Sequence, residues 1–234
     1  MPPESWFWTH DGQQHQVNTV VTAGSRLIRL SAYGSGASRR FAGLVYRDGG
    51  PERTYQMDLD AAAATACPHP VAVTVDDERR FWVVMEPARA APSSLRVHLE
   101  ATTVRAALAA GAHIADLATY VSDGTRYYAV VLDERPGPCW LLAGVTAGEL
   151  RSGLRRLHAK PTLIRAHPDE PRFTAVAVPA DRPPRYWYTD LTGDQVASRL
   201  ERKGSYPTDL DAIRTPAGVR FTVTMRRERH WWNF

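Results

Sequence analysis

RFAGLV at residues 40–45 is the first of five related stretches that decide the fold of this chain. Each stretch begins with an arginine and an aromatic residue and continues with small and apolar residues. The other copies are RFWVVM at 80–85, RYYAVV at 126–131, RFTAVA at 172–177 and RFTVTM at 220–225. The five arginines are 40, 46, 46 and 48 residues apart. Recurrence at a nearly fixed spacing indicates a tandem repeat.

The segments around these stretches give each unit the same order of strand, helix, strand, hairpin and strand. Capping boxes mark helix starts at Thr146 and Thr192, where Glu149 and Gln195 follow three residues later. The second strands are short apolar segments such as 27–33 and 114–120, and Gly-containing turns such as 122–124 follow them. Because Asp-Gly before an aromatic-rich run is a strong hairpin signal, the arginine-led stretch is the third strand.

One such unit cannot bury its apolar face alone, but stacked units can share a core. We therefore expect an α+β repeat protein in which five strand-helix-strand-strand units form a curved sheet, a barrel or half-barrel, with the helices on its outer face. The chain is expected to be a single repeat domain. Its units span approximately 6–50, 51–92, 93–138, 139–185 and 186–234.

The composition limits the kinds of binding partner that are expected. The formal net charge is +4 and the pI about 9.3, but like charges do not gather in a long block, so nucleic acid is not an expected partner. No apolar run has transmembrane length, and the N-terminal residues lack the pattern of a signal peptide, so no membrane partner and a cytoplasmic location are expected. Two isolated cysteines, Cys67 and Cys139, suit a reducing compartment. The predominance of Arg over Lys and the abundant Ala suggest a bacterium of high GC content.

The order of helix, glycine, strand ending in tyrosine, turn, Arg-aromatic stretch and tryptophan resembles the bacterial tandem repeat domain. That domain forms the N-terminal part of polyglycine hydrolases and of related secreted proteins with a β-lactamase-like domain. The resemblance covers nearly the whole chain and is weakest in the second unit. It implies a sheet-and-helix repeat of barrel or half-barrel shape. It implies no activity, because the catalytic serine of that family lies in the other domain and this chain contains no Ser-x-x-Lys.

Catalytic and cofactor motifs are absent from the sequence. Tyr33-Gly34-Ser35-Gly36 lacks the Gly-Lys-Ser/Thr of a phosphate loop and precedes a strand, so it is interpreted as a hairpin turn. There is no Gly-x-Ser-x-Gly and no His-Glu-x-x-His, and His10 and His15 have a poor metal-ligand spacing. Neither a metal site nor a cofactor is expected.

Residues that recur in every unit are interpreted as structural. The five arginines are expected to bond turn carbonyls or neighbouring carboxylates, and the repeated aromatics are expected to pack the core. Function is expected where the units differ, since a ligand meets each unit in a different way.

The second strands, aligned on Tyr33, Val75, Tyr120, Ala166 and Ile213, show which positions differ. One face is apolar and is expected to meet the helices: Leu30, Ala72, Leu117, Leu163 and Leu210. The other face carries polar residues: Arg29, Ser31, Tyr33, Asp116, Tyr120, Asp209 and Asp211. On the third strands, the face of the arginine carries Ala42, Trp82, Tyr128, Thr174 and Thr222. If both faces look inward, they line one concave surface, which is the usual form of a binding site.

Two functions fit this pattern. In the first, the concave face binds a peptide, a glycan or a small metabolite without chemistry, using Arg29, Tyr33, Trp82, Asp116, Tyr120, Tyr128 and Asp209. In the second, the chain is a stand-alone cyclase, isomerase or hydrolase of bacterial secondary metabolism. Asp116 or Asp209 would then be the general acid or base, Tyr33 or Tyr120 would donate to an oxyanion, and Arg29 would hold a negative group. A closed cavity with a buried, unpaired aspartate would favour the enzyme, and an open groove would favour binding.

Overall fold

Five repeats of strand, helix, strand and strand make up the computed structural model, which describes residues 3–20, 24–87, 89–180, 185–202 and 205–227. We call each repeat a blade. Blade 1 holds β1 (Ser5–Gly12), α1 (Gln14–Val20), β2 (Arg26–Tyr33) and β3 (Arg40–Arg47), and blade 2 holds β4 (Thr54–Leu59), α2 (Ala61–Thr65), β5 (Pro70–Val75) and β6 (Phe81–Met85). Blade 3 holds β7 (Ser93–Leu99), α3 (Ala101–Ala109), β8 (His113–Ser122) and β9 (Thr125–Asp133). Blade 4 holds β10 (Trp140–Val145), α4 (Ala147–Arg156), β11 (Ala159–Ala166) and β12 (Phe173–Pro179), and blade 5 holds β13 (Arg185–Leu191), α5 (Gly193–Arg202), β14 (Ser205–Thr215) and β15 (Gly218–Arg227).

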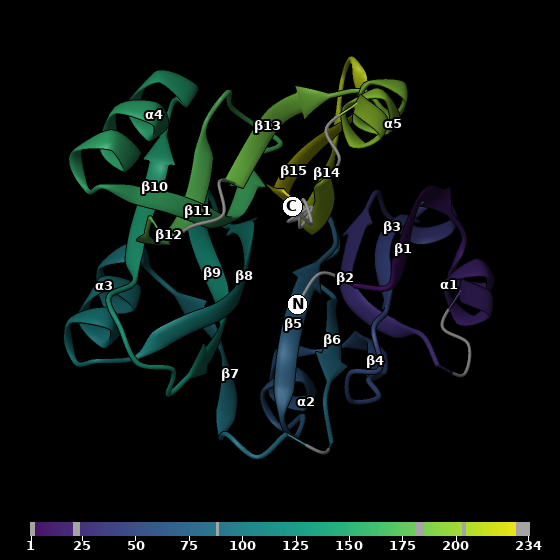
Figure 1. Ribbon diagram of the computed structural model, residues 1–234. Helices are drawn as coiled ribbons and strands as arrows, with labels where there is room; N and C mark the ends of the chain where they lie inside the picture. Colours follow the sequence, from purple (N-terminus) through teal and green to yellow (C-terminus); the bar gives the residue numbers. More distant parts are fainter. Residues whose placement is uncertain (1–2, 21–23, 88, 181–184, 203–204, 228–234) are drawn as a thin grey trace, which may run out of the picture.

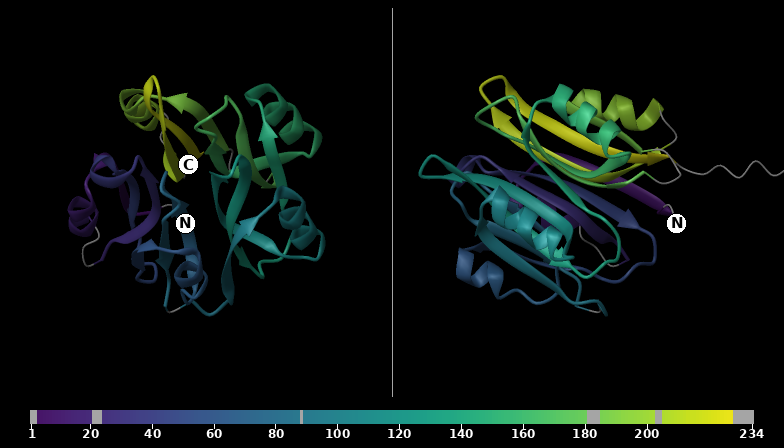
Figure 2. Two further views of the ribbon diagram at one scale, coloured as in Figure 1. Left: turned by 180° about the vertical axis from the view of Figure 1, so that it is seen from behind. Right: turned by 90° about the vertical axis from the view of Figure 1, so that its left-hand side faces the viewer.

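The blades form a ring around a central axis (Figure 1). In each blade the third strand lies between the first and second strands, and all pairs are antiparallel, as in the order β1-β3-β2. The second strands β2, β5, β8, β11 and β14 face the axis and neighbour one another, and β14 lies beside β2, which closes the ring. The helices lie at the periphery (Figure 2). The described strands form five separate three-stranded sheets, and the expected continuous barrel is not found among them.

Local signals in the sequence account for the helix starts. Thr146 accepts a hydrogen bond from the N–H of Glu149, and the Glu149 carboxylate accepts one from the N–H of Thr146, so the predicted capping box is confirmed. Thr192 and Gln195 make the same reciprocal pair. The predicted hairpin turn at Asp123 and Gly124 is also confirmed, with φ of 51° and 74°, the left-handed region that Asp-Gly adopts readily.

A bulge in the first strand of every blade fixes which residues are equivalent. Each bulge ends in a residue of positive φ: Asp11, Asp58, His98, Gly144 and Asp190. The next residue pairs with the repeated aromatic of the third strand, which is Phe41, Phe81, Tyr128, Phe173 or Phe221. In blade 3 the sequence alignment was therefore one residue out of register, because Tyr127 takes the place of the arginine and Arg126 precedes it.

The repeated arginines have the structural role expected of them, and in three blades they hold the bulge. In blades 2, 4 and 5 the arginines bind the bulge residue, with Arg80 Nε 3.1 Å from Asp58 and Arg172 Nη1 2.6 Å from the Gly144 carbonyl. In blades 1 and 3 a tyrosine does this instead. The hydroxyl groups of Tyr33 and Tyr120 accept hydrogen bonds from the N–H groups of Asp11 and His98, each at 2.9 Å.

Apolar cores lie between consecutive blades, and each contains a repeated aromatic. In each core, the face of one sheet that carries the helix packs against the helix-free face of the sheet in the next blade. Blade 5 closes on blade 1 in the same way, since Phe221 shares a core with Trp6 and Trp8, and the Trp8 and Phe221 rings are 5.9 Å apart. Trp231 and Trp232, which follow the last repeat, lie outside the described residues.

Candidate functional site

A second bulge, in each axis-facing strand, sets which side chains point to the axis. In each blade, the first residue after this bulge pairs with the residue of the third strand that lies three positions beyond the repeated aromatic. These first residues are Arg29, Ala72, Asp116, Leu163 and Asp209. The alignment of these strands from the sequence was one residue out in blades 2 and 4. The residues equivalent to Tyr33 in these two blades are Asp76 and His167, and not Val75 and Ala166 as expected. Arg165 therefore belongs to the polar face, and the apolar face facing the helices is Leu30, Val73, Leu117, Ile164 and Leu210.

Four charged side chains meet at the axis and form a buried ring of ion pairs, which we call the axial cluster. Arg29 contacts Asp116 at 2.6 Å and Asp209 at 2.7 Å. Arg165 contacts the same two carboxylates, at 2.8 Å and 2.7 Å. Each residue comes from a different blade, and all four are buried. The cluster therefore links blades 1, 3, 4 and 5 through their axis-facing strands.

Mutual attraction favours the charged forms of Asp209 and Arg165 despite their burial. Burial alone would raise the pKa of Asp209, but Arg165 and Arg29 outweigh it and hold that pKa below its ordinary value. Burial alone would lower the pKa of Arg165, whereas Asp209 and Asp116 raise it. Because each charge has two partners of opposite sign, removing one member would leave buried charges uncompensated.

Polar side chains near the axis also satisfy the free edges of the sheets. The second strand is an edge strand, and its outward N–H groups need partners. Asp116 accepts a hydrogen bond from the N–H of Val73 in the preceding blade at 2.8 Å. The same kind of bond joins Ser31 to Ala212, Thr74 to Ala32, Asp209 to Ile164 and Asp211 to Ala166. The positions that differ between blades thus help to close the ring.

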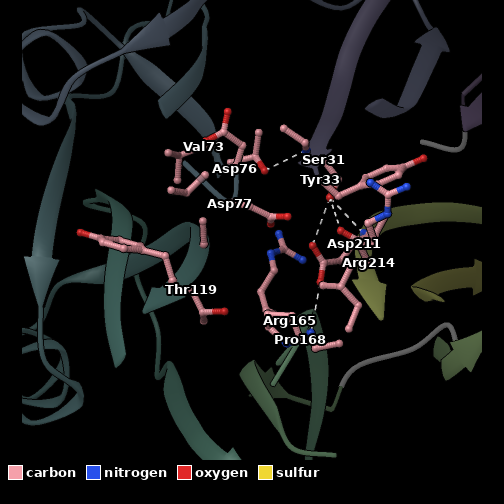
Figure 3. Close-up of a pocket in the computed structure, with 18 of the residues that line it drawn as sticks. Ser31, Tyr33, Val73, Asp76, Asp77, Thr119, Arg165, Pro168, Asp211 and Arg214 are labelled. Carbon is pink, nitrogen blue, oxygen red and sulfur yellow. Dashed lines mark hydrogen bonds between the residues drawn. The ribbon is translucent and has the colours of Figure 1, made fainter. Parts of the chain in front are cut away.

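Above the axial cluster, all five axis-facing strands end around one cavity of about 340 Å³, which we call the axial cavity. It is lined at one equivalent position of each strand by Ser31, Thr74, Ala118, Arg165 and Asp211. Figure 3 shows Asp77, Arg165 and Asp211, from three blades, turned towards the same space. The volume lies at the lower end of the range for pockets that hold small ligands.

Some charged groups that line the axial cavity are held in ion pairs, and others contact only neutral partners. Asp76 is 2.7 Å from Arg39, and Asp169 is 2.5 Å from Arg126. Arg79 and Arg214 instead donate to the hydroxyl groups of Ser122 and Ser38. Asp77 accepts a hydrogen bond from the N–H of Gly34, and partial burial together with the neighbouring Asp76 raises its pKa. The mouth therefore offers both guanidinium groups and carboxylates to a ligand.

Asp211 is the acidic group of the cavity floor. Its oxygens accept hydrogen bonds from the N–H of Ala166 at 3.1 Å and from the Ser31 hydroxyl at 3.3 Å. Burial raises the pKa of Asp211 to about 6, although Arg165 acts in the opposite direction. The group therefore changes its charge near neutral pH.

A second pocket of about 340 Å³ adjoins the axial cavity between blades 4 and 5. The two spaces share the lining residues Ala166, Pro168, Asp169 and Ile213. His167 lines the second pocket and is held between Glu170 and Thr174, each 3.0 Å away, and burial lowers its pKa. We call this space the side pocket.

The opposite end of the axis carries a smaller pocket of about 220 Å³ lined by Arg29, Arg53, Arg89 and Arg135. Arg53 pairs with Glu86 at 2.9 Å, and Asp133 pairs with Arg89 and Arg135 at 2.8 Å and 2.7 Å. Burial alone would raise the pKa of Asp133, but His113 and Arg135 lower it to about 2. Of these pairs, Arg89 with Asp133 joins blades 2 and 3, whereas the other two lie within one blade.

The structure brings some of the candidate residues together and separates others. Arg29, Asp116 and Asp209 meet in the axial cluster, and Tyr33 and Tyr120 line the axial cavity. Trp82 and Tyr128 lie inside the cores between blades and do not line the axial cavity. Arg165 was missed because of the register error in blade 4. The cavity-lining residues Asp77, Arg79 and Arg214 lie in or beside turns, where strand periodicity gives no signal.

A comparison with known protein families finds no family model that matches the chain, and a comparison with curated proteins finds no matching sequence. In the part of the chain that the structure describes, no helix has the length and apolar character needed to cross a membrane. Over the same residues, His, Cys, Asp and Glu side chains do not gather in groups of three or more that could hold a metal ion.

Proposed function

We propose that this chain is a ligand-binding repeat domain that holds a small molecule in the axial cavity. The observation that carries the proposal is the contrast between equivalent positions. The repeated aromatics Phe41, Phe81, Tyr128, Phe173 and Phe221 all lie in cores, whereas one equivalent position of the axis-facing strands is Ser, Thr, Ala, Arg or Asp and lines the cavity in every blade. Four of these side chains, Ser31, Thr74, Arg165 and Asp211, also bind a neighbouring blade, but the polar atoms around the cavity differ from blade to blade, as recognition of an asymmetric ligand would need.

The size of the cavity bears on the ligand. About 340 Å³ suits a small metabolite or the end of a peptide or glycan, and the adjoining side pocket could take the next group of a longer ligand. The ring of separate sheets supplies the concave surface that a curved sheet was expected to supply. Membership of the bacterial tandem repeat domain remains a proposal, supported by the strand-helix-strand-strand order of all five repeats.

Binding is favoured over catalysis by the state of the candidate acid and base groups. Asp116 and Asp209 are each paired with two arginines, the Tyr33 hydroxyl donates to the Asp11 carboxylate, and the Tyr120 hydroxyl lies 3.0 Å from Nδ1 of His98. A general base needs a free lone pair and an oxyanion donor needs a free O–H within reach of the substrate, and these groups are already engaged. The enzyme alternative therefore lacks support from these residues.

Native mass spectrometry of freshly purified protein tests the proposal. We expect a bound species above the 26.1 kDa of the chain, and we expect Ile213→Trp to abolish it, because Ile213 lines both the axial cavity and the side pocket and the indole would fill them. Ala217→Trp is the matched control, since Ala217 is exposed in the turn of the same hairpin. A bound species that persists in Ile213→Trp but is lost in Ala217→Trp would contradict the proposal.

A further inference from the structure

The axial cluster and Asp211 together hold unequal numbers of positive and negative groups. Arg29 and Arg165 supply two guanidinium groups, and Asp116, Asp209 and Asp211 supply three carboxylates. Among the described residues, no cation lies within 4 Å of the Asp211 carboxylate, although Arg165 is near enough to act on it. The excess negative charge therefore sits at the floor of the axial cavity, where a ligand can reach it.

A second observation points to the same place. Thr222 pairs with Asp211 across β14 and β15, so both side chains lie on one face of the sheet. Thr222 is 1% exposed and lines the side pocket, and its hydroxyl has no hydrogen-bond partner among the described residues. A buried hydroxyl is costly to leave without a partner, so a ligand group that accepts or donates a hydrogen bond there would be stabilised.

We propose that Asp211 in the axial cavity and Thr222 in the adjoining side pocket together bind a positively charged group of the ligand, such as a primary amine. This inference rests on the proposed function, because it assigns the class of ligand that the cavity holds. An ammonium group would balance the third carboxylate and donate to both the Asp211 oxygens and the Thr222 hydroxyl. Arg214 and Arg79 at the mouth would then attract an anionic group on the same ligand.

Asp211 couples binding to pH. The charged and titratable groups around it that line the two pockets or belong to the axial cluster include Arg29 on β2, Asp116 on β8, Arg165 on β11, Arg220 on β15, Asp209 and Arg214 on β14, Asp76 and Asp77 beyond the end of β5, and His167 and Asp169 beyond the end of β11. Because burial raises the pKa of Asp211 to about 6, the free protein holds a proton there at lower pH, and a cationic ligand must displace it. Affinity for a cation should therefore rise about tenfold between about pH 5 and about pH 7, and Asp211→Asn should remove that rise.

Three probes of similar size distinguish the possible classes of ligand. Putrescine is a linear diamine, glutarate is a dianion and xylitol is a neutral polyol. Isothermal titration calorimetry at constant ionic strength should show binding of putrescine to the wild-type chain. Asp211→Asn should weaken it about 10- to 100-fold and Thr222→Val about 3- to 10-fold, the losses typical of a charged and a neutral hydrogen bond. Asp123→Asn, which removes a carboxylate from a turn outside both pockets, should leave it unchanged.

The outcomes distinguish this inference from the proposed function. If glutarate or xylitol binds and putrescine does not, the cavity holds a ligand of another class and only the inference is wrong. If none of the probes binds and native mass spectrometry finds no bound species, both are wrong. Putrescine binding that both Asp211→Asn and Thr222→Val leave unchanged also overturns the inference. Thr222→Val loses no charge and keeps its shape, so it remains informative if Asp211→Asn does not fold.

Discussion

Asp209→Asn should lower the free energy of unfolding by about 3–5 kcal/mol, the usual cost of removing one partner from a buried ion pair. Asn keeps the shape of the side chain and can still accept the hydrogen bond of Ile164, so the loss reports the charge. Without that charge, Arg29 and Arg165 remain buried with Asp116 as their shared carboxylate. Chemical denaturation followed by circular dichroism measures the change. A domain of this kind is stabilised by only about 5–15 kcal/mol, so the loss would be severe.

Asp190→Asn is the control for this experiment. Asp190 also pairs with an arginine, Arg220 at 3.2 Å, but 76% of its side chain is exposed. Exposed ion pairs contribute about 0–1 kcal/mol, so the control should be nearly as stable as the wild-type chain. Equal, small losses for Asp209→Asn and Asp190→Asn would show that the axial cluster does not hold the ring together.

Phe221→Ala should cost about 3–5 kcal/mol, as the deletion of a large core side chain does. Phe221 is 2% exposed and lies in the core that closes blade 5 on blade 1, next to Trp8 and Val196. The cavity left by the ring would weaken the contact that completes the circle. Thermal or chemical denaturation checks the loss, and Val121→Ala, at an exposed position, supplies the baseline.

The same deletion at Phe173 tests whether the repeats are equivalent. Phe173 occupies the corresponding position in blade 4 and is 8% exposed, so its loss should be similar or slightly smaller. If Phe221→Ala melts like the wild-type chain, the side chain does not pack in a core between blades 5 and 1, and the closed ring is wrong.

The repeat and the order of its elements could be predicted because each signal is local. An arginine and an aromatic recur at a nearly fixed spacing, and Thr146 with Glu149 starts a helix without help from distant residues. The assembly of the sheets could not be predicted in the same way. Whether five hairpins join into one barrel or remain separate blades depends on how sheet faces pack, and the expected barrel is not found in the described residues.

The candidate site was predicted only in part, and an error of register explains the main omission. Side chains alternate along a strand, so a shift of one residue exchanges its two faces. The sequence alignment ended the second strands of blades 2 and 4 at Val75 and Ala166, one residue before the equivalent Asp76 and His167, so Arg165 was left out of the polar face. Arg165 contacts Asp116 and Asp209, which the sequence did place on that face. Ile164, and not Leu163 as expected, lies on the apolar face towards the helix.

A crystal structure of the wild-type chain, crystallised directly after purification, tests the central claim most directly. That claim is that the repeated aromatics pack the cores between blades, whereas the axis-facing positions that differ line a ligand-binding cavity as well as joining the blades. The account predicts a bound molecule in the axial cavity with its polar atoms on Arg165, Asp211 or other side chains that differ between blades. An axial cavity that holds only water, while a ligand lies against the outer helices, would contradict it.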